Sequence, residues 1–325
     1  MISHMRGETA RRLRYVKGVC LGIISFFTLL LLLVFLPMHG GPAGPPVRIP
    51  QNASAKEVVA LLTLQGIVKT PNVLYPLIRF APGTSGIKAG VYDLHGRESA
   101  YGLARRLLTG DTGIPETKIT FPEGETVADM TLRIEEVFSK ELAQSFYEEA
   151  RQYEGYLFPD TYYFSVYVSS GDIVSRMKDV FELRTTALST EAKEKSRSFS
   201  DIVIIASLIE KETNTAEDRR IVSGILARRL SLNMPLQVDA VFGYIHQKRG
   251  YEPTREDLKI DSPYNTYRYR GLPPGPIANP GLNSLKAALE PAETPYLFYL
   301  TGRDGAMHYA RTFEEHKQNR ARYLD

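Results

Sequence analysis

The sequence predicts an α+β protein with a single N-terminal transmembrane helix, a small β-α subdomain and a larger mixed α+β domain. Nineteen residues from Gly18 to Leu36 carry no charge, and short strand–turn–helix segments begin at residue 47. Beyond them, helical segments alternate with short strands and with one loop that is dense in glycine and proline. The 325 residues, 43% hydrophobic and 24% charged, have the composition of a folded globular protein. The length favours two domains over one.

The apolar run of residues 18–36 is predicted to cross a membrane. As a helix it would be about 28 Å long, close to the hydrocarbon thickness of roughly 30 Å. Residues 1–17 hold five basic side chains and one acidic side chain. The positive-inside rule keeps this segment in the cytoplasm and places everything after Pro37 outside. A cleaved signal peptide is the alternative, but its apolar region is usually only about 7–15 residues long.

Charge and cysteine content exclude several classes of function. The net charge is +3, and residues 1–38 account for +4 of it, so the rest of the chain is close to neutral. We therefore expect no nucleic-acid partner. The single cysteine, Cys20, lies inside the apolar run, and no zinc-ligand spacing is present. The sequence predicts neither disulfides nor a metal or other cofactor.

Residues 37–46 are dominated by proline and glycine and are predicted to form a short linker. Two similar segments follow, in which a short strand and a turn lead to a helix with a Ser or Thr N-cap. One has its cap at Ser54, the other at Thr126, and a looser copy has its cap at Ser99. Such units resemble LysM-type glycan-binding modules, and we expect a LysM-like subdomain over 47–118. Capped β-α units are also common in proteins that bind no glycan.

The stretch Asp201–Thr213, D-I-V-I-I-A-S-L-I-E-K-E-T, predicts a central helix. Its apolar residues surround the helix, which is typical of a buried element. Glu210 and Glu212 lie at its end. Burial raises the pKa of a carboxyl group, and a carboxyl that is protonated near neutral pH can act as a general acid. Periodicity does not choose between the two glutamates, and both could instead be surface ion-pair partners.

Further features are predicted on either side of this helix. Gln237 and Asp239 would share one face of a strand. Tyr264, Asn265 and Thr266 precede the segment 271–281, in which seven of eleven residues are Gly or Pro. We expect this stiff loop to line a cleft, with a linker as the alternative. The remaining expected elements are a strand within 156–164, helices over 171–198, 215–230 and 284–289, strands over 296–300 and 307–310, and a last helix capped by Thr312.

Four ordered motifs carry a family resemblance: E-K-E-T at 210–213, L-Q-V-D at 236–239, S-P-Y-N-T-Y at 262–267 and G-L-P-P-G-P-I-A-N-P-G at 271–281. From about residue 47 onward, the chain resembles the bacterial endolytic murein transglycosylases, also called MltG or YceG-like proteins. The resemblance implies that residues 119–325 form a catalytic domain on the periplasmic or extracellular side of the cytoplasmic membrane. It also implies peptidoglycan strands as substrate and peptidoglycan synthases as possible partners.

By motif position, the resemblance assigns Glu210 as the catalytic acid/base and Gln237, Asp239, Tyr264, Asn265 and Thr266 as substrate-binding residues. A lytic transglycosylase needs one carboxyl group, because the C6 hydroxyl of N-acetylmuramic acid supplies an intramolecular nucleophile and forms a 1,6-anhydro end. Two alternatives remain: a muramidase that uses Glu210 and Asp239 as its two carboxyl groups, and a noncatalytic glycan-binding scaffold.

Overall fold

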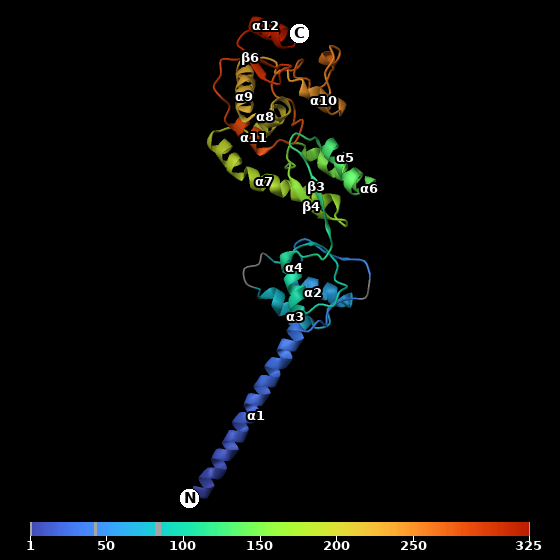
Figure 1. Ribbon diagram of the computed structural model, residues 1–325, viewed down its shortest axis with the longest axis vertical. Coiled ribbons are helices and arrows are strands. Elements are labelled where there is room, and N and C mark those ends of the chain that lie inside the picture. Colours follow the sequence, from blue (N-terminus) through green and yellow to red (C-terminus); the bar gives the residue numbers. More distant parts are fainter. Residues whose placement is uncertain (1, 42–43, 82–85, 325) are drawn as a thin grey trace. The chain divides into compact units, whose positions relative to one another are not determined.

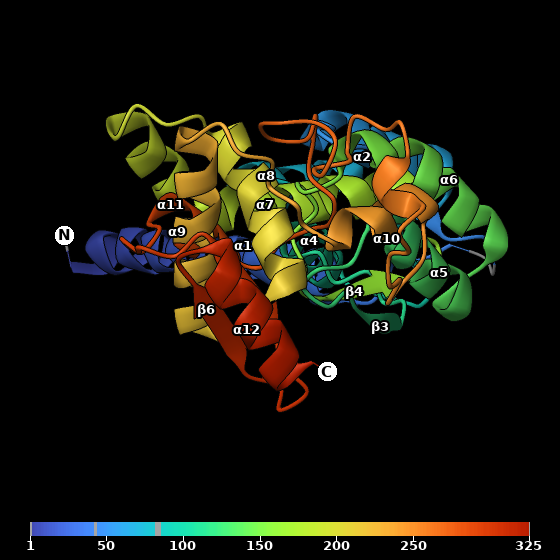
Figure 2. The ribbon, with the colours of Figure 1, turned by 90° about the horizontal axis from the view of Figure 1, so that it is seen from above.

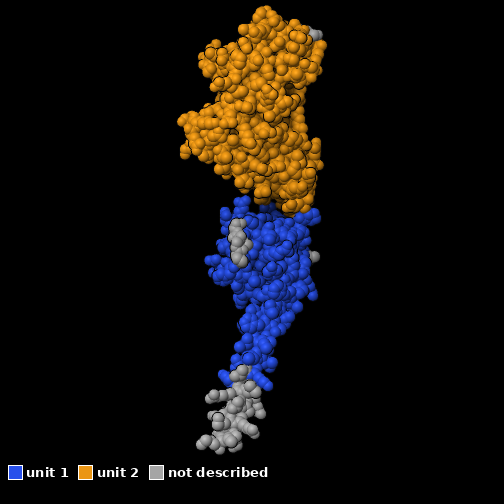
Figure 3. All heavy atoms as spheres, turned by 60° about the vertical axis from the view of Figure 1, so that its left-hand side comes forward, with its two compact units in different colours: residues 1–115 blue, residues 116–325 orange. Residues whose placement is uncertain are grey.

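The computed structural model describes residues 2–41, 44–81 and 86–324. The chain divides into two compact units, Met1–Pro115 and Glu116–Asp325 (Figure 3). The boundary lies within a few residues of the one expected at 118/119. Residues 42–43 of the expected linker lie outside the described residues.

The first unit begins with α1 (Ile2–Phe35). Within the described residues, Lys17–Phe35 is the one stretch of helix long and apolar enough to cross a membrane. This agrees with the prediction of an N-terminal apolar helix and is consistent with an anchor or a signal sequence.

The rest of the first unit has the order β1 (Val47–Ile49), α2 (Ala55–Leu64), α3 (Pro71–Arg79), β2 (Gly90–Tyr92) and α4 (Ala100–Thr109). Strands β1 and β2 pair antiparallel, with Arg48 opposite Val91. Helix α2 starts at the predicted N-cap, since Ser54 and Glu57 form a capping box. Ser99 caps α4 in the same way, by accepting a hydrogen bond from Gly102 N.

Residues 39–41 of the expected linker are part of this folded unit. His39 pairs with Glu98 through two backbone hydrogen bonds of 2.8 Å and is only 1% exposed. Gly40 N donates to Ile67 O and Gly41 N to Leu94 O. Only residues 36–38 therefore separate α1 from the packed structure.

The second unit opens with the same order of elements: β3 (Glu116–Thr120), α5 (Val127–Val137), α6 (Lys140–Ala150), the 3-10 turn η1 (Arg151–Tyr153) and β4 (Thr161–Ser165). Strands β3 and β4 are antiparallel, with Ile119 opposite Tyr162. Thr126 and Asp129 form the capping box of α5. The similarity of the two sequence segments thus corresponds to two β-α-α-β modules, one in each unit.

The remaining elements are α7 (Ser170–Glu194), α8 (Phe199–Glu212), α9 (Ala216–Ser231), α10 (Ala240–His246), η2 (Asp257–Lys259), α11 (Leu282–Leu289), β5 (Phe298–Thr301), β6 (Met307–Ala310) and α12 (Phe313–Tyr323). Helix α8 packs against α7, α9, α10 and α11, and Figure 2 looks down on this group. All eight residues from Ile202 to Ile209 are buried. The prediction of a buried central helix is confirmed.

Three local predictions differ from the structure. Helix α8 has Ser198 as its N-cap and begins at Phe199, two residues before the predicted stretch that starts at Asp201. Helix α11 begins after Gly281, and Ser284 is buried inside it, where its hydroxyl accepts a hydrogen bond from Arg219 Nε. Gln237 and Asp239 do not belong to a strand, because Gln237 has a left-handed φ of 51° and Asp239 is the N-cap of α10.

Candidate active site

A pocket of about 640 Å³ lies within the second unit. Its size is within the range of roughly 300–1,000 Å³ that is common for ligand sites. The β3–β4 module contributes one wall through the start of α5 and the end of α6. The end of α8, helix α10 and the segment that follows α10 contribute the other side. Its polar and aromatic lining includes Asp129, Glu154, Glu212, Asp239, Tyr244, Arg249 and Tyr264.

Glu212, the last residue of α8, lines this pocket. Glu212 is partly buried, and its Oε1 accepts a long hydrogen bond of 3.5 Å from Ala240 N. Burial raises the pKa of Glu212 to about 7, and the nearby charge of Asp239 acts in the same direction. A large share of the Glu212 carboxyls is therefore protonated near neutral pH, as a general acid requires.

Glu210 has a different environment. Its Oε1 pairs with Arg219 Nη2 at 3.1 Å, and its Oε2 accepts a hydrogen bond of 2.8 Å from Gly281 N. The side chain is 5% exposed and is not among the pocket-lining residues of the described chain. Both carboxyl oxygens are thus used to connect the end of α8 to α9 and to the start of α11. The geometry favours a structural role for Glu210 and leaves Glu212 facing the pocket.

Among the described residues, Asp239 and Tyr264 are the two expected substrate-binding residues that line the pocket. Asp239 Oδ1 accepts a short hydrogen bond from the Tyr267 hydroxyl. The Tyr264 ring packs against Tyr244, with ring centroids 4.9 Å apart. These two residues offer a carboxylate and an aromatic surface to a bound ligand.

The other three expected residues shape the surrounding structure. Gln237 Oε1 accepts a hydrogen bond from the buried Arg229. Asn265 is buried, and its amide donates to the carbonyl groups of Leu258 and Ile260. Thr266 Oγ1 accepts a hydrogen bond of 2.9 Å from Val238 N.

The stiff segment 271–281 acts mainly as a connection between α8 and the β3–β4 module. Of its residues, Ile277 lines the pocket within the described structure. Asn279 is fully buried, and its Oδ1 accepts hydrogen bonds from Gly155 N (2.9 Å) and Leu157 N (3.0 Å). Its Nδ2 donates to Glu125 O (3.0 Å) and Glu154 Oε1 (2.8 Å). The expectation of a cleft-lining loop therefore applies to only a small part of it.

Sequence reasoning missed Glu154. This residue lines the pocket, and burial raises its pKa to about 8. Val127 N and Asn279 Nδ2 donate to its carboxyl group. Nothing in its local sequence distinguishes Glu154 from the other glutamates, because its burial arises from α5 and from residue 279, which is distant in the chain.

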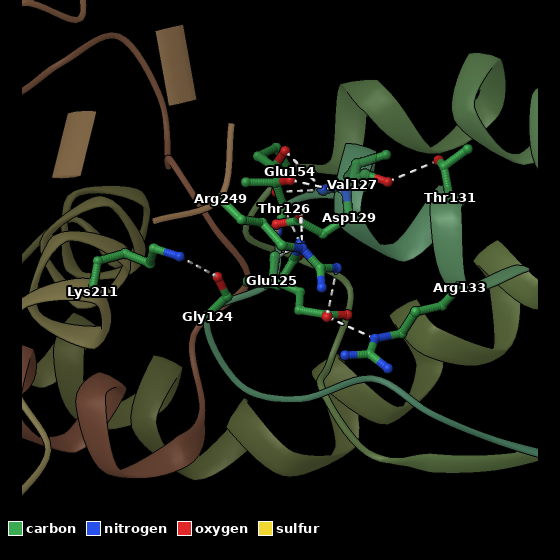
Figure 4. A network of polar contacts seen from close by, with 11 residues as sticks. Gly124, Glu125, Thr126, Val127, Asp129, Thr131, Arg133, Glu154, Lys211 and Arg249 are labelled. Atoms are coloured by element: carbon green, nitrogen blue, oxygen red, sulfur yellow. Dashed lines mark hydrogen bonds and ion pairs between the residues drawn. The ribbon is translucent and has the colours of Figure 1, made fainter. Parts of the chain in front are cut away.

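A charged network joins α5 to the segment after α10 (Figure 4). Arg249 donates to Asp129 and, at 2.8 Å, to Glu125 Oε1. Arg133 Nε also donates to Glu125 Oε1, at 2.6 Å. Because Asp129 and Arg249 both line the pocket, their pair connects its two walls. The described residues contain no group of three side chains arranged to hold a metal ion.

Tyr299 of β5 lies beside Glu212. Its hydroxyl is buried and has no hydrogen-bond partner of regular geometry among the described residues. The nearby charges of Glu212 and Asp239 raise the pKa of the Tyr299 hydroxyl. In turn, interaction with this hydroxyl lowers the pKa of Glu212. The fully buried Arg229 is the nearby cation. This phenol is thus positioned to stabilise the ionised form of Glu212.

Tyr299→Phe is expected to move the high-pH limb of the pH–activity profile upward by roughly one unit. The pKa of Glu212 is expected to rise because its carboxylate loses the stabilising interaction with the Tyr299 hydroxyl. The measurement is kcat/KM against pH. Tyr309→Phe is a matched control, since Tyr309 is the cross-strand neighbour of Tyr299 and donates to Asp218. An unmoved or lowered limb in Tyr299→Phe would contradict the assignment.

Comparisons with known proteins identify the family of this chain. The family described as the YceG-like family matches residues 47–322. A Bacillus subtilis protein named endolytic murein transglycosylase is 30% identical over 305 residues, which cover 86% of this chain and 84% of that protein. A Streptococcus pneumoniae protein of the same name is 26% identical over 321 residues, covering 86% of this chain and 58% of that protein. The crystal structure of a yceG-like protein from Listeria monocytogenes aligns with a TM-score of 0.56 at 26% identity, over 84% of this chain and 98% of that one.

Proposed function

This chain belongs to the YceG-like family, and from that premise we propose that it is an endolytic murein transglycosylase anchored in the bacterial cytoplasmic membrane. Its substrate is the glycan strand of peptidoglycan, and the cleaved bond is the β-1,4 bond between N-acetylmuramic acid and N-acetylglucosamine. The observation that carries this proposal is the carboxyl group of Glu212, which lines a pocket and has a pKa of about 7.

We propose Glu212, in place of Glu210, as the catalytic acid/base. Protonated Glu212 first transfers its proton to the glycosidic oxygen as that oxygen leaves C1 of N-acetylmuramic acid. The resulting carboxylate then removes the proton from the C6 hydroxyl of the same sugar. O6 bonds to C1, the 1,6-anhydro ring closes, and Glu212 is again protonated. The cycle consumes no water, because the nucleophile is held within the substrate.

The neighbours of Glu212 suit both halves of this cycle. Burial and the charge of Asp239 favour the proton donor, whereas Ala240 N–H and the Tyr299 hydroxyl favour the carboxylate. Asp239 carries a negative charge that can stabilise positive charge developing at C1. Tyr264 and Tyr244 provide aromatic faces on which the apolar face of a sugar can pack.

A muramidase is the second candidate, because Glu212 and Asp239 both line the pocket. Two carboxyl groups are what a glycoside hydrolase commonly uses. In that case water, activated by Asp239 or after a glycosyl-enzyme intermediate, would attack C1 and leave a reducing end.

Product analysis distinguishes the two reactions. Full-length protein in detergent is incubated with purified peptidoglycan, and the soluble fragments are examined by mass spectrometry. We expect N-acetylmuramic acid ends that are lighter by one water than reducing ends and that resist borohydride reduction. Reducible ends alone would favour the muramidase. The absence of new ends, with binding retained, would support the noncatalytic scaffold.

We further propose that the enzyme trims or terminates nascent glycan strands beside the peptidoglycan synthases. The anchor would hold the catalytic unit on the outer side of the membrane, where such strands emerge. The β-α-α-β order of the first unit supports a LysM-like glycan-binding subdomain, and its attachment close to α1 suits strands that are still near the membrane.

A further inference from the structure

Helices α3 and α4 present aromatic and basic side chains to solvent. On α3, Tyr75 and Arg79 lie one turn apart and Phe80 follows at the C-cap; on α4, Tyr101 and Arg105 lie one turn apart. Tyr75 is 38% exposed, Tyr101 50% and Phe80 76%. Arg79 and Arg105 are also exposed. These five residues are called the interfacial patch below.

The patch belongs to the two helices that contact the end of α1. Helix α1 packs against both α3 and α4, which also pack against each other (Figure 1). The ring of Phe35, the last residue of α1, lies 5.5 Å from the ring of Tyr101. At least one ring of the patch, that of Tyr101, therefore contacts the outer end of the apolar helix.

The connection between α1 and the packed unit is too short to lift the unit away from a membrane. His39 is held by its backbone bonds to Glu98, and its ring contacts Lys69 N (3.2 Å) and Thr70 Oγ1 (3.0 Å). Four residue steps from Phe35 to His39 span at most about 14 Å. The headgroup layer on each side of a bilayer is roughly 5–8 Å thick. The fold therefore begins within this layer or immediately above it.

The composition of the patch suits that depth. Tyrosine is enriched at membrane–water interfaces because its ring is apolar and its hydroxyl is polar. Phenylalanine enters the boundary between headgroups and acyl chains, and arginine binds anionic headgroups. The guanidinium of Arg79 lies 5.8 Å from the centre of the Phe80 ring, so the basic and apolar groups are adjacent.

We infer that the interfacial patch lies in the headgroup layer of the phospholipid bilayer, so that the first unit rests on the membrane surface. This inference depends on the proposed anchor but not on the chemistry at Glu212. A bilayer is the favoured occupant, since α1 brings one to the edge of the patch.

Depth-dependent fluorescence quenching tests the inference. The chain contains no tryptophan, so one introduced tryptophan reports alone. Full-length Phe80→Trp and Tyr101→Trp variants are reconstituted in vesicles of phosphatidylethanolamine and phosphatidylglycerol. We expect blue-shifted emission and a large loss of intensity when the acyl chains are brominated near the headgroup. Bromination near the chain ends should quench much less.

Two control variants make the result decisive. Phe27→Trp, in the middle of the apolar helix, should be quenched most by bromine near the chain ends. Leu64 lies at the end of α2, outside the patch, and is 87% exposed. The tryptophan of Leu64→Trp should therefore emit as it does in water. Water-like, unquenched emission from positions 80 and 101 with normal quenching at 27 would overturn the inference and leave the patch to a protein partner. An unquenched Phe27→Trp would overturn the anchor and the inference together, while glycan cleavage is measured separately.

Discussion

Glu212→Gln is expected to reduce glycan cleavage by about 10²–10⁴-fold, the usual loss when a general acid–base group is removed. Glutamine keeps the shape and volume of the side chain but has no transferable proton. Binding to intact glycan strands should persist, because Tyr264, Asp239 and the pocket walls are unchanged. The measurement is the rate of formation of anhydro ends, with strand binding followed separately by sedimentation.

Glu210→Gln is the matched comparison on the same helix end. Its loss of charge weakens the contacts with Arg219 and Gly281 N, so we expect a destabilisation of about 1–3 kcal/mol. Cleavage by the folded fraction should fall far less than in Glu212→Gln. A selective loss of cleavage in Glu210→Gln would return the catalytic role to Glu210. An equally severe loss in both would mean that the helix end acts as one structural unit.

Stability against pH gives the Glu212→Gln variant a second, independent signature. Burial raises the pKa of Glu212 in the folded protein from the ordinary value of 4.5 to about 7. Between these values the native state binds more protons than the unfolded chain, so wild-type stability declines as the pH rises. Glutamine does not ionise. The variant should therefore match the wild type below about pH 4.5 and exceed it by up to a few kcal/mol above about pH 7.

Chemical denaturation across this pH range checks the expectation. Glu154, whose pKa is raised to about 8, contributes a similar decline in both proteins. The informative quantity is therefore the difference between wild type and Glu212→Gln. A variant that is less stable than the wild type near neutral pH would identify Glu212 as an ionised structural partner.

Asn279→Ala is expected to be the most destabilising of the single changes considered, at about 3–6 kcal/mol. The substitution leaves the N–H groups of Gly155 and Leu157 without their acceptor and removes two donated hydrogen bonds, all in a fully buried site. Each buried donor or acceptor that loses its partner costs about 1–3 kcal/mol. That is a large part of the 5–15 kcal/mol typical of a whole protein.

Thermal and urea unfolding measure this effect. Asn319→Ala is a suitable control, because its amide donates one hydrogen bond to Tyr309 O from a partly exposed position. It should cost about 1 kcal/mol or less. A similarly small cost for Asn279→Ala would mean that segment 271–281 does not tie the β3–β4 module to α8.

Many elements could be predicted because their causes are local. Ser54, Ser99, Thr126 and Thr312 cap helices through hydrogen bonds to residues three positions away, and all four were identified from the sequence. The apolar part of α1 follows from composition. Helix α8 follows from periodicity, because apolar residues occupy all of its faces.

The candidate site could be predicted only in part, since periodicity gives the faces of a helix and not what each face meets. Glu210 and Glu212 are about 200° apart around α8. The sequence leaves open whether either of them faces inward. In the structure Arg219 and Gly281 pair with Glu210, whereas Asp239, Ala240 and Tyr299 lie beside Glu212. Motif position alone selected Glu210, the glutamate that pairs with Arg219 of α9.

By itself, therefore, the sequence determined the N-terminal apolar helix, the capped β-α segments, the buried central helix and the family motifs. These features depend on neighbours within a few residues, on apolar content or on short motifs. The tertiary structure decided which motif residues reach the pocket. Asp239 and Tyr264 line it, whereas Asn265, Thr266 and Asn279 are fully or almost fully buried. Asn265 holds the nearby backbone of residues 258–260, and Thr266 and Asn279 hold the backbone of more distant segments. The reason is physical: a buried polar side chain must satisfy its hydrogen bonds, and its partners here lie as many as 154 positions away in the chain.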